Sequence, residues 1–276
     1  MNLKRSYSEI KRLASENKFA DVFLLIKEVE KQKLAIVAES ESKNGVLPKI
    51  IGRGLEYTVY SMTNGRVRKR PNTVAEQNDV LLSWCIDGEK RRNKIIESIN
   101  NLSEISVELV QEILAAYRIH KSLLGSPVFK KNGSYTQNKI VTLDAYFENH
   151  NISENEKVVD KYVEFVHHLW MAGMCDGTFK FLENNGINNE GDLVQLDFGE
   201  MIFTKEKVIS LIESKKWLSQ NFRFIADESL KLYIEERFEQ ELTLSKLEKF
   251  WPERFINSDK IKKWEELYNQ YSKSWA

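Results

Sequence analysis

The feature that most constrains the fold is the segment 176–200, in which two aspartates flank a short hairpin pattern. It opens with Asp176, passes Asn184 and a glycine-containing turn, and continues into the apolar run Leu193–Leu196, which leads directly into Asp197-Phe198-Gly199. A short apolar run bounded by turn residues is typical of a buried strand. The segment therefore predicts a short strand pair with carboxylate and amide side chains at its ends.

A second constraining feature is a glycine-containing hairpin upstream. Gly52 and Gly54 precede the strand-like residue Val59, and Lys69 lies on a predicted return strand beyond an Asn64-Gly65 turn. Glycines let backbone N–H groups approach phosphates without obstruction by a Cβ atom, and a lysine neutralises phosphate charge. Each signal is weak alone, because Gly-x-Gly also occurs in ordinary turns and a single strand lysine is usually a solvated edge charge.

Hydrophobic periodicity predicts the remaining elements. A polar stretch over 39–45 is typical of a linker. Helices are expected over 8–33, 73–124, 153–174 and from 204 onward, strands over 47–60, 66–70 and 193–196, and a second hairpin over 126–142. Four large aromatic residues are expected to anchor the core near the C-terminal end: Trp217, Phe222, Trp251 and Trp264.

Taken in order, these segments resemble the protein-kinase-like superfamily, including the small kinases typified by aminoglycoside phosphotransferases. Asp197-Phe198-Gly199 is similar to the metal-binding Asp-Phe-Gly of kinases, and Asn184 precedes it at the spacing of the asparagine that holds the second metal ion. Asp176 then occupies the position of the catalytic aspartate. His168 occupies that of a helix-end histidine with a structural role.

The resemblance implies an α+β, bilobal, protein-kinase-like fold. The glycine hairpin resembles the strands with which kinases cover ATP, which implies nucleotide contacts at Gly52, Gly54, Val59 and Lys69. The expected parts are a helical N-terminal extension over 1–45, a small antiparallel-sheet N-lobe over 46–142 and a mainly helical C-lobe over 143–276.

The resemblance also implies an enzyme, an ATP-dependent phosphotransferase that moves the γ-phosphate to a hydroxyl acceptor with the help of Mg²⁺. Phosphoryl transfer depends chiefly on placing metal ions and charges around the triphosphate and on orienting the acceptor. Asp197 and Asn184 would hold the metal, and Lys69 would neutralise phosphate charge. Asp176 would accept or orient the acceptor proton, with Lys180 as the lysine of the catalytic loop.

The chain departs from the kinase pattern at several points. Met174-Cys175 stands where His-Arg normally precedes the catalytic aspartate, and the loop over 176–184 is longer than usual. Tyr57 replaces the third glycine of the phosphate loop. The glutamate that would pair with the strand lysine is either Glu76, which also fits a Thr-x-x-Glu capping box, or Glu89.

The segment after Glu200 gives the only constraint on the acceptor. A helix predicted from Thr204 leaves no room for a long activation segment or an Ala-Pro-Glu sequence, which favours a small-molecule, sugar or lipid acceptor over a protein one. Minimal kinases that modify proteins without this segment make that preference modest. Two alternatives stay open: a nucleotide-binding pseudokinase or scaffold that acts through protein–protein contacts, and transfer of AMP to a protein.

Composition and motifs disfavour several other classes. Lys plus Arg and Asp plus Glu number 41 each, so the formal net charge is zero and no overall field would attract nucleic acid. Cys85 and Cys175 form neither a disulfide framework nor a zinc motif. No apolar run approaches a membrane span and no signal-peptide pattern follows the basic start, so a cytoplasmic protein of undetermined oligomeric state is expected. The histidines show no metal-ligand spacing: His120, His150, His167 and His168.

Overall fold

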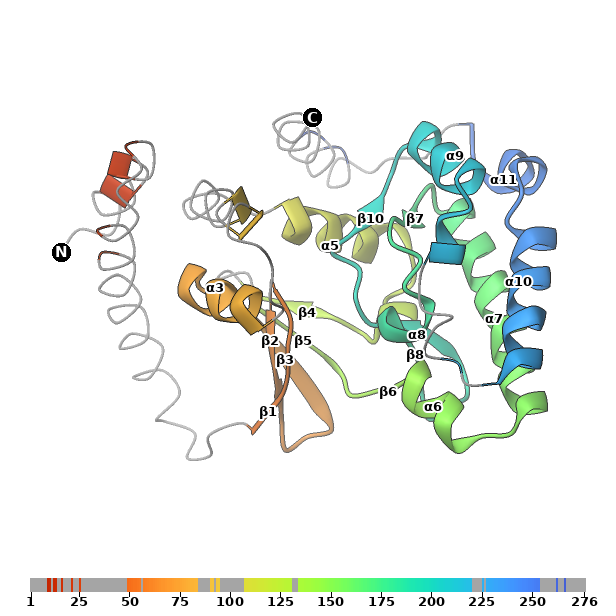
Figure 1. Ribbon diagram of the computed structural model, residues 1–276, viewed down its shortest axis with the longest axis horizontal. Helices are drawn as coiled ribbons and strands as arrows, with labels where there is room; N and C mark the ends of the chain where they lie inside the picture. The colour runs from red at the N-terminus through yellow and green to blue at the C-terminus, as the bar shows by residue number, and fades with distance from the viewer. Residues whose placement is uncertain are drawn as a thin grey trace. The chain divides into compact units, whose positions relative to one another are not determined.

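The computed structural model describes most of the chain between residues 49 and 253. The described ranges are 49–55, 57–83, 107–130, 134–219 and 227–253, with 9–10, 12–13, 16, 21, 25, 90–91, 93–94, 225, 262 and 266. They form an α+β protein with an antiparallel sheet and several helices (Figure 1), as the sequence predicts. The predicted linker 39–45 and two of the expected anchors, Phe222 and Trp264, lie outside the described residues.

Contacts divide the chain into two units. The first comprises Met1–Ser106 and Val128–Gln137, and the second comprises Val107–Pro127 and Asn138–Ala276. The domain boundaries expected from the sequence at 45 and 142 stay a prediction. Each unit is described separately.

A five-stranded sheet in the order β1-β2-β3-β5-β4 forms the centre of the first unit. The predicted strand region 47–60 is split by the glycine-containing turn into two antiparallel strands, and Gly65, at φ 71°, closes the next turn as the Asn-Gly pair predicts. The second predicted hairpin is present as β4 and β5, but it ends at Asn138, and Val141, expected on its return strand, pairs instead with Ile187 on β8 (Asn185–Ile187). The elements are β1 (Lys49–Arg53), β2 (Tyr57–Ser61), β3 (Arg66–Pro71), α3 (Val74–Ser83), β4 (Val128–Phe129) and β5 (Tyr135–Asn138).

Helix α3 begins with a capping box and is joined to the sheet by an ion pair. The backbone N–H of Thr73 donates to Glu76 Oε2 at 2.9 Å, and the backbone N–H of Glu76 donates to Thr73 Oγ1 at 3.2 Å. Arg70 on β3 donates to both carboxylate oxygens of Glu76. Glu76 was expected either to pair with Lys69 or to cap the helix. The structure supports the cap and shows Arg70 as the ion-pair partner of Glu76. Glu89, the other candidate partner of Lys69, lies outside the described residues.

The second unit is mainly helical and contains two small sheets. Strands β7 and β10 pair with each other, and β6, β8 and β9 form the other sheet. Its elements are α5 (Val107–Arg118), the 3₁₀ turn η2 (Lys121–Leu124), β6 (Val141–Thr142), α6 (Leu143–Asn149), α7 (Ile152–Met171), β7 (Cys175–Asp176), α8 (Phe181–Asn184), β8 (Asn185–Ile187), β9 (Leu193–Gln195), β10 (Met201–Ile202), α9 (Lys205–Glu213), η3 (Lys216–Ser219), α10 (Glu228–Glu241) and α11 (Leu244–Phe250).

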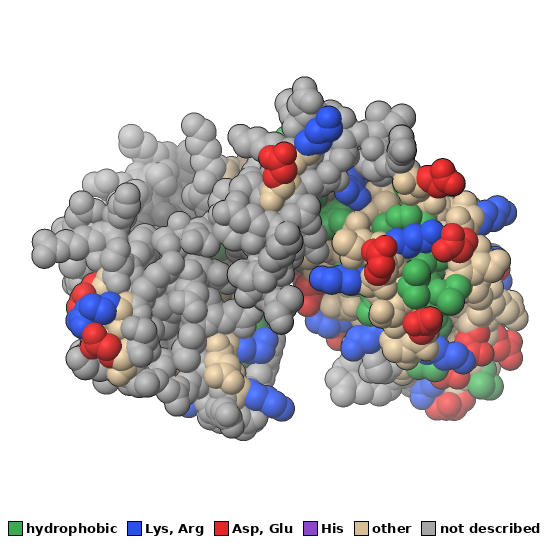
Figure 2. All heavy atoms as spheres, turned by 90° about the horizontal axis from the view of Figure 1, so that it is seen from above, with side chains coloured by type: hydrophobic (Ala, Val, Ile, Leu, Met, Phe, Trp, Pro, Cys, Tyr) green, Lys and Arg blue, Asp and Glu red, His purple; other side chains and the backbone are tan. Residues whose placement is uncertain are grey.

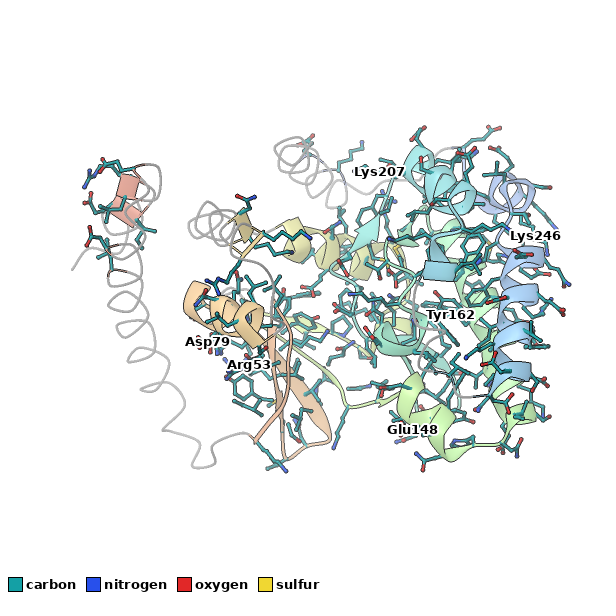
Figure 3. All side chains as sticks on the ribbon, viewed as in Figure 1. Arg53, Asp79, Glu148, Tyr162, Lys207 and Lys246 are labelled. Atoms are coloured by element: carbon teal, nitrogen blue, oxygen red, sulfur yellow. The ribbon has the colours of Figure 1, made fainter. Side chains whose placement is uncertain are left out.

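The core of the second unit surrounds α7, which the sequence predicts over 153–174. The helix begins with a capping box between Asn151 and Glu154, and its buried face packs against α10. Tyr162 lies in this core (Figure 3), with its ring 4.8 Å from that of Phe181 and 5.5 Å from that of Phe238. Such a continuous apolar stripe supplies most of the stability of a helix in a globular protein.

The expected aromatic anchors differ in burial. Trp217 is 2% exposed and contacts Phe179 edge to face, as predicted, whereas Trp251 is only half-buried.

On the face drawn in Figure 2, Lys and Arg side chains are interspersed with Asp and Glu, in line with the zero net charge. No helix among the described residues combines the length and the apolar character needed to cross a bilayer.

We expect Glu76→Gln to lower the free energy of unfolding by about 1–2 kcal/mol, because it weakens both the cap and the pair with Arg70. Burial acts to raise the pKa of Glu76, but the hydrogen bonds from Arg70 and Thr73 outweigh it and hold that pKa below its ordinary value of 4.5. The stabilisation is therefore fully present above about pH 4.5 and is lost as the pH falls through the lowered pKa. Urea titrations across pH 3–7 measure this difference.

Asp79→Asn provides the matched control, because Asp79 is an exposed carboxylate on the same helix. It should change stability by less than about 0.5 kcal/mol. A loss of stability for Glu76→Gln that is equally large at pH 3 and pH 7 would contradict the ion pair.

Candidate functional site

In the first unit, three residues predicted to bind the cofactor form one row across adjacent strands. Gly52 on β1 lies opposite Val59 on β2, and Val59 lies opposite Lys69 on β3. Directly opposed residues on neighbouring strands project from the same face of a sheet. A bulge between Ile50 and Gly52 bends β1 at this point, a feature often found beside binding sites.

The fourth predicted residue, Gly54, is engaged within the turn itself. Its backbone N–H donates to Tyr57 O at 2.9 Å, and its carbonyl accepts from Asn72 Nδ2 at 2.7 Å. Asn72 also donates to Leu55 O at 2.9 Å and accepts from Thr58 Oγ1 at 2.6 Å. The Gly54 amide could bind a phosphate only if the turn opened, and Asn72, which the sequence did not single out, fixes the turn.

Lys69 is nearly buried, at 9% exposure. Its Nζ lies 5.5 Å from the ring centroid of Tyr135, which itself contacts Tyr57 edge to face at 5.7 Å. A lysine over a tyrosine ring is stabilised by the ring's negative face. Tyr57, which replaces the third glycine, therefore packs against the ring of Tyr135, and Lys69 lies over that same ring.

In the second unit, Asp176 is a buried carboxylate with a complete set of donors. It is 4% exposed and ends β7. Oδ1 accepts from the N–H of Thr178 at 2.8 Å and from its Oγ1 at 2.7 Å. Oδ2 accepts from Gln195 Nε2 at 3.0 Å and from Asn184 Nδ2 at 3.3 Å.

These four bonds match the roughly four lone-pair positions of a carboxylate. The donors compensate the burial of the charge and fix its orientation. In this conformation Asp176 is suited to holding its neighbours in place. To accept a proton from a substrate, it must first release one of its four hydrogen bonds.

Asn184 and Asp197 lie beside this carboxylate. The N–H of Asp197 approaches Asn184 O at 3.3 Å, and the carbonyl of Asp197 accepts from Gln195 Nε2 at 2.8 Å. The Asp197 side chain is exposed, whereas the following Phe198 is 1% exposed and anchors the loop. The structure thus brings together Asp176, Asn184 and Asp197, three residues that the sequence predicts to share a site.

The orientation of the Asn184 amide is set by its partners. Nδ2 donates to Asp176 and, at 3.1 Å, to Thr178 Oγ1. Both side-chain hydrogen bonds of Asn184 to described residues use Nδ2, and neither involves Oδ1. The amide oxygen and the exposed Asp197 carboxylate are hard oxygen donors of the kind that Mg²⁺ prefers, so this donor set fits the predicted metal.

Lys180, the predicted loop lysine, lies at the start of α8. Its Nζ is 3.8 Å from Glu200 Oε2, and the two side chains are 38% and 54% exposed. An ion pair so exposed contributes little to stability. The structure associates Lys180 with Glu200, and its catalytic role stays a prediction.

Besides Asn72 in the first unit, two further residues were not singled out from the sequence, Thr178 and Gln195, which contact Asp176. Gln195 is 1% exposed and bridges Asp176 to the backbone of Asp197. The sequence did contain a signal for Gln195, which is an amide within the apolar run over 193–196. A polar residue in a buried strand usually has specific hydrogen-bond partners. The only signal for Thr178 was its position two residues after Asp176, a spacing typical of turns in which an aspartate side chain accepts a backbone hydrogen bond.

The neighbouring titratable groups are held in their neutral forms. Burial raises the pKa of Cys175 to about 12, so its thiol is not a nucleophile at neutral pH. Burial, with the nearby charge of Asp176, raises the pKa of Tyr162 well above its ordinary value.

Of the two adjacent histidines, His167 packs in the helical core. Burial lowers the pKa of His167, whose ring lies 4.5 Å from that of Phe250 and whose Nε2 lies 3.1 Å from Glu241 O. His168, next to it, is exposed. The described part of the chain contains no cluster of three His, Cys, Asp or Glu residues able to hold a metal ion.

Comparisons with known proteins give little guidance. No family model matches the chain, and no curated protein matches it. Among solved structures, the complex of Rv3197 with erythromycin from Mycobacterium tuberculosis is similar, with a TM-score of 0.39 and 13% identity over 82% of this chain and 71% of that one. A TM-score this low does not define a shared fold.

We expect Gln195→Met to lower the free energy of unfolding by about 1–3 kcal/mol, because it removes two buried hydrogen bonds and leaves an oxygen of Asp176 undersatisfied. Gln195→Glu should cost more, since it places a second carboxylate against the first. Gln111→Met is the control: Gln111 is half-buried, and among the described residues its side chain makes one hydrogen bond, to Met201 O. Urea unfolding compares the three, and equal losses for both methionine variants would show that Gln195 has no special role.

Proposed function

We propose that the chain is an ATP-dependent phosphotransferase that acts with Mg²⁺. The observation that carries the proposal is the cluster in the second unit, where Asp176 orients the Asn184 amide and the backbone of Asp197, whose side chain is exposed, contacts Asn184. The resemblance of the same residues to a kinase site gives the cluster its chemical meaning. A bilobal kinase-like fold and the cofactor ATP are parts of this proposal.

The proposal gives each residue a role that suits its chemistry and position. Asp197 and the free amide oxygen of Asn184 would hold Mg²⁺, which supplies positive charge against the phosphates. The Gly52–Val59–Lys69 row would contact the nucleotide, with Lys69 neutralising phosphate charge. Asp176 would hold Asn184 and orient the acceptor hydroxyl, and it could act as a base after releasing one donor.

A compact acceptor is favoured by the segment after the metal-binding loop. Strand β10 begins at Met201 and α9 at Lys205, so little chain is left between them to build a docking platform for a protein. A small molecule, a sugar or a lipid headgroup therefore fits the proposal better than a peptide.

A second candidate is a nucleotide-binding pseudokinase. It is favoured by two observations, the engaged amide of Gly54 and the saturated carboxylate of Asp176. Both groups are already satisfied without substrate. The two candidates share nucleotide binding and differ in turnover.

Binding and turnover test these functions separately. We expect ATP with Mg²⁺, at about a hundredfold excess over its Kd, to raise the melting temperature by about 5 °C or more. Asp197→Asn should abolish the Mg²⁺-dependent part of this rise, because it removes the charged ligand. Glu190→Gln is the control, an exposed carboxylate in the turn before β9 that should leave the rise intact. A rise that survives Asp197→Asn unchanged would refute the metal site.

Incubation with γ-labelled or α-labelled ATP distinguishes the reactions. Label transferred from the γ position to an acceptor supports the phosphotransferase, whereas AMP transfer releases the γ label as pyrophosphate. Label retained from the α position indicates AMP transfer, and nucleotide binding without either reaction supports the pseudokinase.

A further inference from the structure

A cavity of about 500 Å³ lies in the second unit, between α6, the start of α7, α8 and the start of α10. It is lined by none of the residues proposed to bind nucleotide or metal. Its apolar wall includes Leu182 and Leu230, which are 2% and 3% exposed. The cavity is large enough for a small organic molecule.

Four carboxylates line this cavity: Asp144, Glu148, Glu183 and Asp227. Figure 3 places Glu148 on α6. No Lys or Arg occurs among the described lining residues, and His150 is the single base there. Its ring stacks on Tyr146 and its Nδ1 lies 2.7 Å from Tyr146 O. The described part of the cavity wall therefore has an excess of negative charge.

Two of the carboxylates are already committed to backbone contacts. Asp144 Oδ1 accepts from the N–H of Ala145 at 2.8 Å. Asp227 caps α10 through the N–H of Leu230, and hydrogen bonds from Ser229 and Leu230 lower its pKa. Glu148 and Glu183 are exposed, and no ion pair joins either to another described residue. Those two remain available to a ligand.

Asn155 gives an independent indication of a ligand. This residue lines the cavity and is 3% exposed. Its Nδ2 donates to Phe147 O at 3.2 Å and to His150 O at 3.3 Å, whereas its Oδ1 has no hydrogen-bond partner among the described residues. A buried carbonyl oxygen without a donor is costly, and a ligand N–H would satisfy it.

We propose that this cavity binds an organic cation, an ammonium group or groups carried on an apolar body. An ammonium group only donates hydrogen bonds, which suits a wall of carboxylates and an amide oxygen. The apolar wall suits a hydrocarbon body. A bare metal ion fits less well, because no three acidic or histidine side chains of the described residues come together to coordinate one.

A calorimetric titration with 1,8-diaminooctane tests the inference, with 1,8-octanediol as the probe that keeps the same carbon chain without charge. The diamine should bind and the diol should bind at least about tenfold more weakly, because the charges supply the discrimination. The double variant Glu148→Gln with Glu183→Gln should raise the Kd of the diamine about tenfold. Both side chains are exposed, so the variant should melt like the parent chain.

Glu213→Gln, an exposed carboxylate on α9 that does not line the cavity, should leave the diamine Kd unchanged. Equal binding of diol and diamine, no binding of the diamine, or an unchanged Kd in the double variant would each overturn the proposal. Tighter binding of Mg²⁺ or Ca²⁺ than of the diamine in the same titration would overturn it in favour of a metal site. No nucleotide is present in these titrations, so their outcome is independent of the proposed phosphotransferase.

Discussion

The buried carboxylate of Asp176 is the constraint on which the second unit's site depends. A charge at 4% exposure is tolerated only if every oxygen is compensated, and here the donors come from three different elements. Thr178 belongs to the loop after β7, Asn184 ends α8 and Gln195 ends β9. The carboxylate thus joins segments that are otherwise short and weakly stable alone. Removing any one donor leaves the charge undersatisfied, which explains why a site of such small elements can be well defined.

The same bonds determine what the site can do chemically. Gln195 holds Asp176 through its side chain and Asp197 through its backbone, so the exposed carboxylate is placed relative to the buried one. Asn184 has its amide nitrogen directed toward Asp176, which leaves the amide oxygen for another partner. The buried charge therefore orients the amide of Asn184 directly, and Gln195 connects it to the backbone of Asp197. The metal-assisted transfer that we propose would need oxygen ligands preorganised in this way.

Sequence reasoning succeeded where a single local rule decides the outcome. The Asn64-Gly65 turn, the strand at Leu193 and the helix spanning α7 follow from turn chemistry and periodicity. It was less successful where the answer depends on which face of an element meets a neighbour. Lys69 and Arg70 are adjacent on β3 and so project to opposite faces; the structure shows that Arg70 meets Glu76 while Lys69 lies over Tyr135. No pattern in the sequence indicates which face of the sheet helix α3 covers.

Helix α8 shows how one short element serves two environments. Its last residue, Asn184, is directed to the carboxylate of Asp176, whereas Leu182 and Glu183 line the acidic cavity. The helix comprises only the four residues Phe181–Asn184, so a shift of its backbone would move both sets of side chains together. Its position is fixed by Phe181, which packs against the rings of Tyr162 and Phe238 in the apolar core. The packing of Phe181 therefore helps to place both the Asn184 amide and the wall of the cavity, so apolar packing contributes to both places alongside their charged side chains.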